Sequence, residues 1–561
     1  MKLLRFFCCI FLILLSMVNS HDHSLKTSKC GFKHNLIPEL GIGEELSEEI
    51  TQDLEKRKLY SQSHPFKIHV DTSNVRGISN ELKEYLVNVI AKRGNEILAS
   101  KIGITGYQVV PRSRYYSKYC NYQHIVSVPN KYSYENTNAD FLLFLATDDT
   151  GNDGTLAYAT ACFTEKGTKR PNVGLAVFNP YYLDPNKGKL DNDIATYVHE
   201  VLHALVFSSQ LWANFPLVID YKKRKRVEQY YIDDYGIHRL RGENLLAVVK
   251  DHFGCDDIEG VPLEDDGGEG SKGGHFERIV FGDETMVSED VGVAKFSKVT
   301  LALMKDSGWY DIDLSKGDYY TWGKGEGCQL FNKTCNQGQI EEICDQNNNF
   351  GCDKTYRYKM NCSKTSFTNG CNIKMKDQNC NRPSSNGYFF EKFGISSRCQ
   401  EFFYHGKKYA GCVEIRCNRS KTAYQVTLQG NEPKQFVCYK ENEIKTPYES
   451  SGQNPTYQYV CENPKLICRN MCPKDCYLRG KCLEDQTCDC DFFYSGNLCG
   501  TFKGCQGLSR SLCSKLYYSN KFNNKNYSNQ FDNSDYDRNY TSYTSWTDLQ
   551  KRYLYKADSG L

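Results

Sequence analysis

The sequence is best interpreted outward from one stretch, Thr196-Tyr197-Val198-His199-Glu200-Val201-Leu202-His203-Ala204-Leu205. Two histidines four residues apart on a helix lie one above the other on the same face, where they can share one metal ion. The residues between and beside them are mostly apolar, which indicates a buried helix. Because polar side chains in a buried helix need partners, the pattern predicts a metal site here.

The residue types of this stretch suit zinc. Neutral imidazoles bind zinc well, and a catalytic zinc typically has three protein ligands and a water. Glu200 directly follows the first histidine and can face the same cleft, where it would take a proton from that water. The alternative is a pair of ordinary helix histidines beside a surface glutamate, which the apolar surroundings disfavour.

A third ligand has to come from farther along the chain, and His238, His252 and His275 are the nearest downstream candidates. His275 lies in Gly273-Gly274-His275-Phe276-Glu277 after a glycine-rich run, and glycine lets a backbone turn sharply and approach a metal closely. Asp283-Glu284-Thr285-Met286 follows and could form a turn beneath the site. Taken alone, His275 could equally be a histidine of a surface loop.

Periodicity around this stretch predicts one α+β domain over residues 65–320. The apolar patterns predict strands at 66–70, 141–145 and 173–179, and an amphipathic helix over 81–98. The helix that carries the two histidines is expected over 194–207, with Asp191 or Asp193 as its cap. Residues 321–460 are dense in cysteine and poor in long periodic segments, which predicts a disulfide-stapled region.

The last part of the chain changes in amino-acid composition twice. Residues 461–505 contain the spacing Cys472-x3-Cys476-x5-Cys482-x5-Cys488-x-Cys490-x8-Cys499, which resembles an EGF-like module, although a generic cystine-rich loop is the alternative. Residues 506–561 are expected to be a low-complexity tail, disordered from about residue 517. Acceptor motifs for N-glycosylation, which predict a glycoprotein, occur only in the C-terminal half, at Asn332, Asn361, Asn418, Asn526 and Asn539.

The N-terminus indicates the compartment. Residues 1–20 have a cationic start, an apolar run and small residues near the end, as in a secretory signal peptide. No later stretch is apolar enough to span a membrane, and the C-terminus lacks the apolar tail of a GPI signal. A secreted, soluble protein is therefore expected. The net charge of +2 provides no field to attract nucleic acid.

Of 27 cysteines, Cys8 and Cys9 would leave with the signal peptide, and an odd number would remain. Cys30 stands apart from the others, in the polar segment 21–64, and is the natural candidate for an unpaired thiol with another task.

Three segments together resemble leishmanolysin, a metzincin-type zinc endopeptidase: His199–Ser208, His275 through Met286, and Leu301–Tyr310. The resemblance covers roughly residues 28–440. It implies a metzincin-like protease domain with a long active-site helix, His275 as the third zinc ligand and Met286 as a structural turn. It also implies the disulfides Cys120–Cys162 and Cys255–Cys328.

The resemblance gives Cys30 a role as well. Lys29–Asn35 resembles the family's prosegment motif, in which a cysteine thiolate occupies the open zinc position, so residues 21–64 are expected to be an inhibitory prosegment. One position departs from the family: Val206 stands where a glycine ends the helix. Either the helix continues before turning, or the site is distorted.

The resulting prediction is a secreted zinc endopeptidase that binds one Zn²⁺ per chain through His199, His203 and His275. Glu200 is its general base and Met286 a structural floor; protein or peptide substrates are expected, with a separate protein partner possible for the EGF-like module. Two alternatives remain, a catalytically inactive adhesion or binding protein and a zinc hydrolase acting on a non-peptide substrate.

Overall fold

The computed structural model describes residues 40–42 and 62–522, with internal gaps at 107, 188, 221, 267–270, 292–293, 333–334, 336–339, 345–349, 382–389, 395, 405, 431–432, 448–457, 469–475, 477–478 and 506. The predicted signal peptide, Cys30 and the tail beyond residue 522 lie outside the described residues. Within the described part, no helix combines the length and apolar character needed to cross a membrane.

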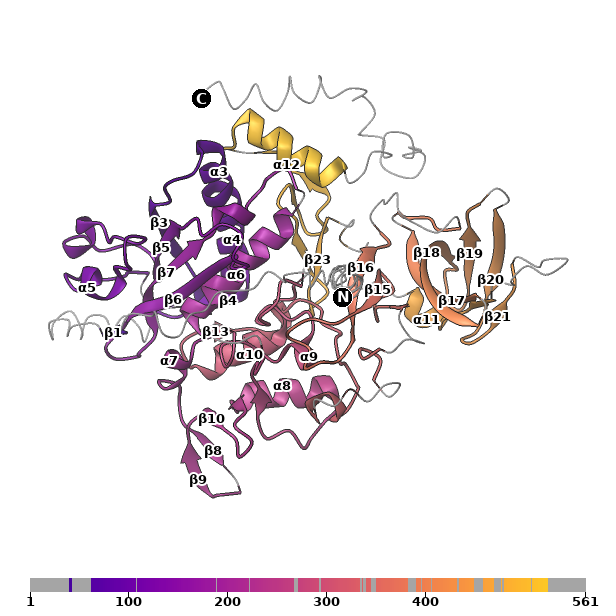
Figure 1. The fold of residues 1–561 in the computed structure, drawn as a ribbon, viewed down its shortest axis with the longest axis horizontal. Helices are drawn as coiled ribbons and strands as arrows, with labels where there is room; N and C mark the ends of the chain where they lie inside the picture. Colours follow the sequence, from indigo (N-terminus) through magenta and orange to yellow (C-terminus); the bar gives the residue numbers. More distant parts are fainter. Residues whose placement is uncertain are drawn as a thin grey trace, which may run out of the picture.

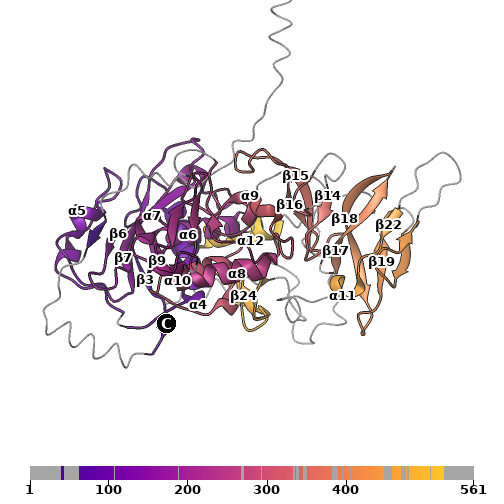
Figure 2. The same cartoon turned by 90° about the horizontal axis from the view of Figure 1, so that it is seen from below.

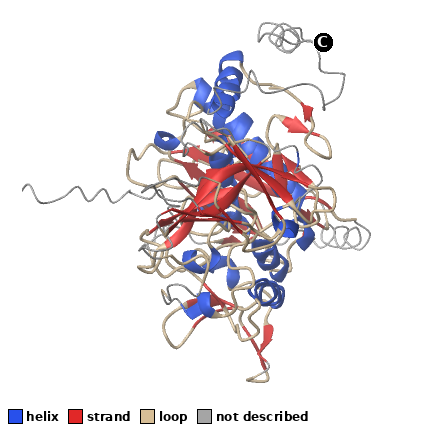
Figure 3. Cartoon of the chain, turned by 90° about the vertical axis from the view of Figure 1, so that its right-hand side faces the viewer, coloured by secondary structure: helices blue, strands red, loops and turns tan. Residues whose placement is uncertain are grey.

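A five-stranded sheet organises the N-terminal half (Figures 1 and 3). Its order is β1-β6-β7-β5-β3, and only the β6–β7 pair is antiparallel. The strands are β1 (Gly41–Ile42), β3 (Ile68–Asn74), β5 (Phe141–Thr147), β6 (Ala157–Thr164) and β7 (Pro171–Phe178). Strands β5 and β7 are buried along their whole length, as their continuous apolar sequences require.

One face of the sheet is covered by two long helical segments. The first is a continuous run with a π-helical middle: α3 (Asn80–Glu84), η2 (Tyr85–Ala91) and α4 (Lys92–Lys101). The second is α6 (Leu190–Leu205), which packs on β6 and β7. Tyr85, Leu86, Val89 and Ile90 of the predicted apolar stripe are fully buried in the core between helices and sheet. The helix predicted over 81–98 is therefore confirmed, with ends a few residues outside the expected ones.

The opposite face carries a smaller core under an irregular segment. Short helices α5 (Tyr116–Cys120) and η3 (Asn130–Ser133) cover this face, and Tyr116 and Tyr132 pack on Phe163 and Phe144, respectively. The disulfide Cys120–Cys162 joins α5 to β6, which confirms the pairing implied by the resemblance.

Below the sheet lies a mainly helical layer that completes the N-terminal domain (Figure 1). Helices α8 (Glu243–Phe253) and α10 (Lys298–Asp306) pack on each other, and the Asp306 carboxylate accepts the N–H groups of Asn244 and Leu245 at the start of α8. The disulfide Cys255–Cys328 follows α8, again as implied. The remaining elements of this domain are β2 (His64–Pro65), β4 (Ile102–Ile104), η4 (Pro180–Tyr182), α7 (Ser209–Trp212), β8 (Val218–Asp220), β9 (Lys225–Val227), β10 (Tyr230–Ile232), β11 (His238–Leu240), β12 (Val261–Pro262), α9 (Arg278–Phe281), β13 (Asp311–Ile312) and η5 (Leu314–Lys316).

The cysteine-rich region is built from two antiparallel sheets to one side of the N-terminal domain (Figures 1 and 2). Six disulfides staple them: Cys335–Cys371, Cys344–Cys362, Cys352–Cys399, Cys380–Cys412, Cys417–Cys468 and Cys438–Cys461. The prediction of a disulfide-rich C-terminal region is confirmed. Its elements are η6 (Gln329–Asn332), β14 (Phe350–Cys352), β15 (Tyr358–Ser363), β16 (Ile373–Asn379), β17 (Ser397–Tyr404), β18 (Lys407–Cys417), β19 (Tyr424–Leu428), β20 (Lys434–Cys438), β21 (Ile444–Lys445), β22 (Gln458–Val460) and α11 (Pro464–Ile467).

The chain then returns to the N-terminal domain, where it contacts α3 and α4. Small hairpins β23 (Gly480–Cys482) with β24 (Cys488–Cys490), and β25 (Tyr494–Ser495) with β26 (Thr501–Phe502), are stapled by Cys476–Cys488 and Cys490–Cys499. Helix α12 (Arg510–Phe522) follows and lies near α3, so the first part of the segment expected as a disordered tail is helical. Leu512 and Leu516 are buried in the main core, which explains this order.

Candidate metal centre

Helix α6 brings two of the candidate ligands together. Its apolar residues face the sheet, and the helix buries both His199 and His203, which are 8% and 0% exposed. Its cap differs from the prediction: Lys189 occupies the N-cap position, while Asp191 and Asp193 lie in the first turn. Asp193 instead accepts the hydroxyl of Tyr85 from the neighbouring helix.

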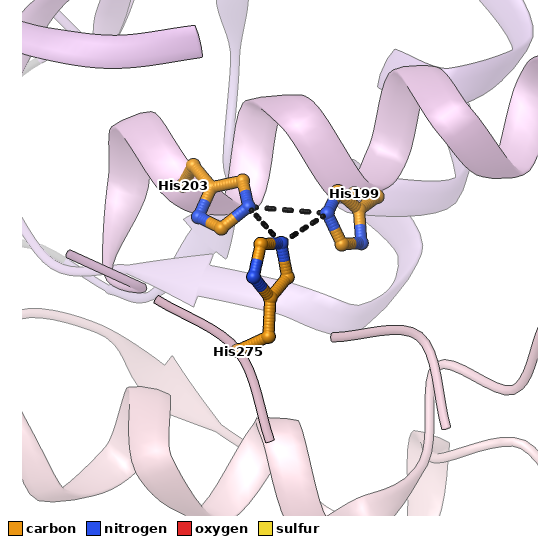
Figure 4. A group of neighbouring side chains, drawn as sticks. All are labelled: His199, His203 and His275. Atoms are coloured by element: carbon orange, nitrogen blue, oxygen red, sulfur yellow. Dashed lines mark hydrogen bonds between the residues drawn. The ribbon is translucent and has the colours of Figure 1, made fainter. Parts of the chain in front are cut away.

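His275 approaches from a loop beneath α6 and completes a triangle of imidazoles (Figure 4). The Nε2 atoms of His199 and His203 are 3.1 Å apart, and His275 Nε2 lies 3.3 Å and 3.1 Å from them. A tetrahedral zinc with Zn–N bonds of about 2.05 Å would separate its ligand nitrogens by about 3.3 Å. The three nitrogens therefore fit a single zinc ion.

The other ring nitrogen of each histidine shows which way the lone pair points. Nδ1 lies 2.6 Å from the Thr285 carbonyl oxygen in His199, 2.8 Å from that of Phe207 in His203, and 3.1 Å from that of Ser271 in His275. A carbonyl only accepts, so each Nδ1 carries the hydrogen and each Nε2 lone pair faces the centre. Burial also lowers the pKa of His199 to about 4, which keeps that ring neutral. The three lone pairs converge, and they repel one another unless a cation lies between them. Converging lone pairs are the arrangement that a metal site requires.

The turn at Glu284–Met286 supports two of the three histidines. Thr285 contributes the carbonyl that orients His199, and the Met286 carbonyl accepts the N–H of Phe276, the residue after His275. The Glu284 carboxylate holds the turn through the Met286 N–H and the hydroxyls of Ser297 and Thr300. Burial raises the pKa of Glu284 to about 7. Met286 is fully buried in the main core.

Glu264 shapes the loop that delivers His275, a role the sequence did not reveal. Its N–H donates to the His275 carbonyl, and its own carbonyl accepts the N–H of Gly273, whose φ of +69° is the left-handed conformation that glycine favours. Its carboxylate accepts the Ser288 hydroxyl and the Arg278 N–H. No periodicity or motif around Glu264 indicates in the sequence that its carboxylate stabilises this loop.

Glu200 is fully buried as a residue yet lines a cleft that opens beside His199. One wall of the cleft comes from α6 and the other from the segment that follows Met286, and Leu156 just before β6 also lines it. Other lining residues include Asn192, Ala195, Thr196, Thr285, Val287 and Ser288. A peptide lying in this cleft would pass next to His199 and Glu200.

His238 and His252 lie away from the triangle. His252 Nε2 bonds to the Trp322 carbonyl at 2.7 Å and its ring stacks on Tyr320, so it is a buried structural residue. His238 bonds to the hydroxyl of Tyr230. Among the described residues, a second group could also hold a metal, namely the carboxylates Glu264, Asp265 and Glu277. The Glu264 carboxylate is already engaged in bracing the histidine loop.

Val206 does not adopt the conformation that a family glycine would supply. The helix ends at Leu205, and Val206 has φ −154° and ψ −31°, outside the left-handed region. Both expectations raised for this position are wrong: the helix does not continue, and the three histidines still converge. A β-branched side chain is accommodated because φ is negative, and the Val206 carbonyl accepts the indole N–H of Trp212.

We expect Val206→Gly to destabilise the protein rather than improve it. The Val206 side chain is 0% exposed, so its removal costs about 2 kcal/mol of burial, and glycine adds about 0.5–1 kcal/mol of backbone entropy. Thermal unfolding should show Tm lowered by several degrees, with Val206→Ala intermediate as the control. An unchanged Tm for the glycine variant would contradict this assignment.

The middle of the chain is similar in sequence to one family of known proteins. The sequence profile of the leishmanolysin family matches residues 75–392. A leishmanolysin-like peptidase of Drosophila melanogaster is 33% identical over 232 residues, which cover 35% of this chain and 34% of the relative. Leishmanolysin of Leishmania chagasi is 25% identical over 336 residues, covering 52% and 54% of the two chains. A ciliated left-right organizer metallopeptidase of Xenopus laevis is 28% identical over 278 residues, covering 47% and 38%. The chain thus matches about a third to a half of the length of these relatives.

Proposed function

Because this chain belongs to the leishmanolysin family, a family of zinc-dependent metalloendopeptidases, we propose that it hydrolyses peptide bonds with a zinc ion held by His199, His203 and His275. The observation that carries the proposal is the triangle of Nε2 atoms, 3.1–3.3 Å on each side, with each Nδ1 tied to a backbone carbonyl. Pre-oriented, neutral imidazoles are the ligands that zinc prefers.

Each protein group then has a distinct task. Zinc, when bound, lowers the pKa of a water and polarises the scissile carbonyl. Glu200 is the general base that takes the proton of the attacking water and later delivers it to the leaving amine. Met286 and the Thr285 carbonyl hold the histidines in place, since their turn contacts the backbone or ring of both His199 and the His275 loop.

The proposal is tested by incubating the purified, activated protein with casein, with and without a chelator of zinc. Cleavage that the chelator stops, and that added zinc restores, supports a zinc endopeptidase. Absence of cleavage by protein that carries one zinc per chain would favour the inactive binding protein instead. Cleavage of small esters but not of peptides would favour the non-peptide hydrolase.

The N-terminal segment is proposed to keep the enzyme latent, with Cys30 as the blocking thiol. The described residues Gly41 and Ile42 pair in parallel with Phe163 and Thr164, at the free edge of β6. Because β1 runs parallel to β6, the N-terminal end of β1 points toward the end of β6 that follows Leu156, and Leu156 lines the cleft. Cys30 precedes Gly41 by 11 positions, a reach of up to about 36 Å, and the path from Phe163 to Leu156 needs only about 23 Å of strand.

Cys30→Ser should therefore yield a precursor that is active, or processes itself, without an activator. A neutral hydroxyl is a much poorer zinc ligand than a thiolate, so the serine variant cannot hold the site closed. Both precursors are expressed and peptide cleavage is compared before any processing, with Cys30→Ala as a second variant. Equal latency in all three would mean that the segment blocks the cleft by bulk alone.

We also propose that the protein is secreted. The many disulfides fit an extracellular protein, because such bonds persist in oxidising compartments. Asn361 and Asn418, two of the predicted glycosylation positions, are exposed.

A further inference from the structure

A short hairpin projects from the lower end of the molecule (Figure 1). Its strands, β8 (Val218–Asp220) and β9 (Lys225–Val227), are antiparallel and form a two-stranded sheet of their own. All five residues of the segment 222–226, which leads into β9, are exposed. A surface outside the protein can therefore reach this segment directly.

This segment is a block of five consecutive cations: Lys222-Lys223-Arg224-Lys225-Arg226. Lys222 pairs with Glu259, and the Lys223 ammonium lies 3.8 Å from the Asp220 carboxylate. Within the described part of the chain, the three cations of residues 224–226 have no carboxylate within ion-pair distance. A local positive charge thus remains uncompensated, although the net charge of the whole chain is only +2. Blocks of this kind are typical of segments that bind an anionic partner.

The conformation of Arg224 indicates that its side chain, rather than the shape of the turn, accounts for its presence. Its φ is +49°, in the left-handed region that glycine and asparagine adopt most easily. Arginine gains nothing from this backbone conformation, and a glycine would form the same turn with less strain. A disfavoured residue at an exposed position therefore points to a role for its charge.

Exposed apolar side chains accompany the cations. Eleven large apolar residues are exposed in the described part of the chain, and four of them fall within residues 217–235: Leu217, Ile219, Ile232 and Tyr235. Ile219 is the cross-strand partner of Arg226, so the two side chains lie on the same face of the hairpin. This face therefore presents an apolar group directly beside a cation.

A lipid surface with anionic headgroups matches both features. Its charge attracts cations that come within about 8 Å at physiological ionic strength, which a projecting hairpin can do. The boundary between its headgroups and acyl chains also accepts apolar side chains, and burying them adds to the binding. A sulfated polysaccharide would instead use the cations alone and would leave Ile219 in water.

We propose that this hairpin docks the protein onto an anionic lipid surface, with residues 224–226 at the headgroup phosphates and Ile219 inserted beside them. A few cations together with a few apolar side chains give a reversible attachment at the surface rather than a permanent insertion. The proposal goes beyond the peptidase function and does not depend on it.

The test is co-sedimentation of the purified full chain with vesicles of phosphatidylcholine, either alone or mixed with phosphatidylserine. The wild type should bind the mixed vesicles more tightly than the neutral ones, and less tightly as salt is raised, because salt screens the attraction. Each Lys or Arg near an anionic surface strengthens binding about fivefold, so Arg224→Gln, Lys225→Gln and Arg226→Gln together should weaken it about a hundredfold. Ile219→Thr keeps a β-branched residue in the strand and should weaken binding severalfold, a loss that persists at high salt.

Arg416→Gln, Arg419→Gln and Lys421→Gln together are the matched control, because they remove the same number of arginines and lysines from exposed positions of the cysteine-rich region. This control should bind as the wild type does. Arg224→Gly tests the hairpin without a folding cost, since glycine suits a φ of +49°. It should keep the wild-type Tm and lose about fivefold in binding to the mixed vesicles.

The proposal is overturned if the wild type does not bind the mixed vesicles, if it binds both kinds of vesicle equally, or if the two triple variants bind equally tightly. Retention of the wild type on a heparin column without binding to vesicles would also overturn it, and would assign the hairpin to sulfated polysaccharides. None of these measurements uses peptidase activity, so the docking surface and the proposed function can fail independently.

Discussion

Glu200→Gln is expected to retain one zinc per chain and to lose nearly all proteolysis. General acid–base catalysis contributes about 10²–10⁴-fold to such reactions, so casein and peptide cleavage should fall by at least that range. Glutamine preserves the shape of the side chain at this fully buried position but cannot accept the proton of the attacking water. Zinc analysis of the purified variant and initial rates on the same sample provide the two measurements.

Glu243→Gln is the matched control, because Glu243 is an exposed residue in the first turn of α8, away from the cleft. It should match the wild type in both zinc content and rate. If Glu200→Gln digests casein at the wild-type rate, the proton moves by another route. Loss of zinc in that variant would show instead that Glu200 supports the metal site.

His275→Ala should remove zinc from the protein. Mutating a residue that merely orients a ligand typically weakens metal affinity 10–100-fold, so losing one of three ligands should cost at least about a hundredfold. Competition with a chromophoric chelator measures the affinity directly, independently of activity. The two remaining imidazoles, 3.1 Å apart on α6, would leave the site open on the side of the loop.

His238→Ala and His252→Ala should retain full zinc, which makes them controls of the same residue type. His252→Ala is also expected to lower Tm, since it deletes a buried ring and its bond to the Trp322 carbonyl. The two readouts therefore separate a structural histidine from a ligand. If the His275 variant keeps its full zinc content, another residue must be the third zinc ligand.

Local sequence patterns were enough to predict several elements of the structure. The helical period placed His199 and His203 on one face, because residues four apart in a helix share a face whatever surrounds them. Continuous apolar runs predicted β5 and β7, and the cysteine density predicted the stapled region. In each case the information lies within a few residues of the chain, so a single sequence contains it.

Other features depended on contacts between distant segments. Sequence alone left His238, His252 and His275 open until a family resemblance favoured one, and the structure shows why. The carbonyl of Thr285 and the backbone of Glu264 hold the His199 ring and the His275 loop, and neither contact has a local signature. The helix end at Val206 was misjudged for the same reason, since its φ depends on how residues 206–212 pack.

The sequence by itself thus determined that His199 and His203 share one helix face, the likeness to the leishmanolysin family, and a cysteine content that suits an oxidising compartment. Only the tertiary structure decided which histidine completes the triangle, that Val206 needs no glycine, and that the hairpin of β23 and β24 returns to α4 and α6. The physical reason is that periodicity and residue type act over a few positions. Contacts between segments hundreds of residues apart depend instead on buried ion pairs that form only in the folded protein. The pair of Arg93 with Asp489 is one example.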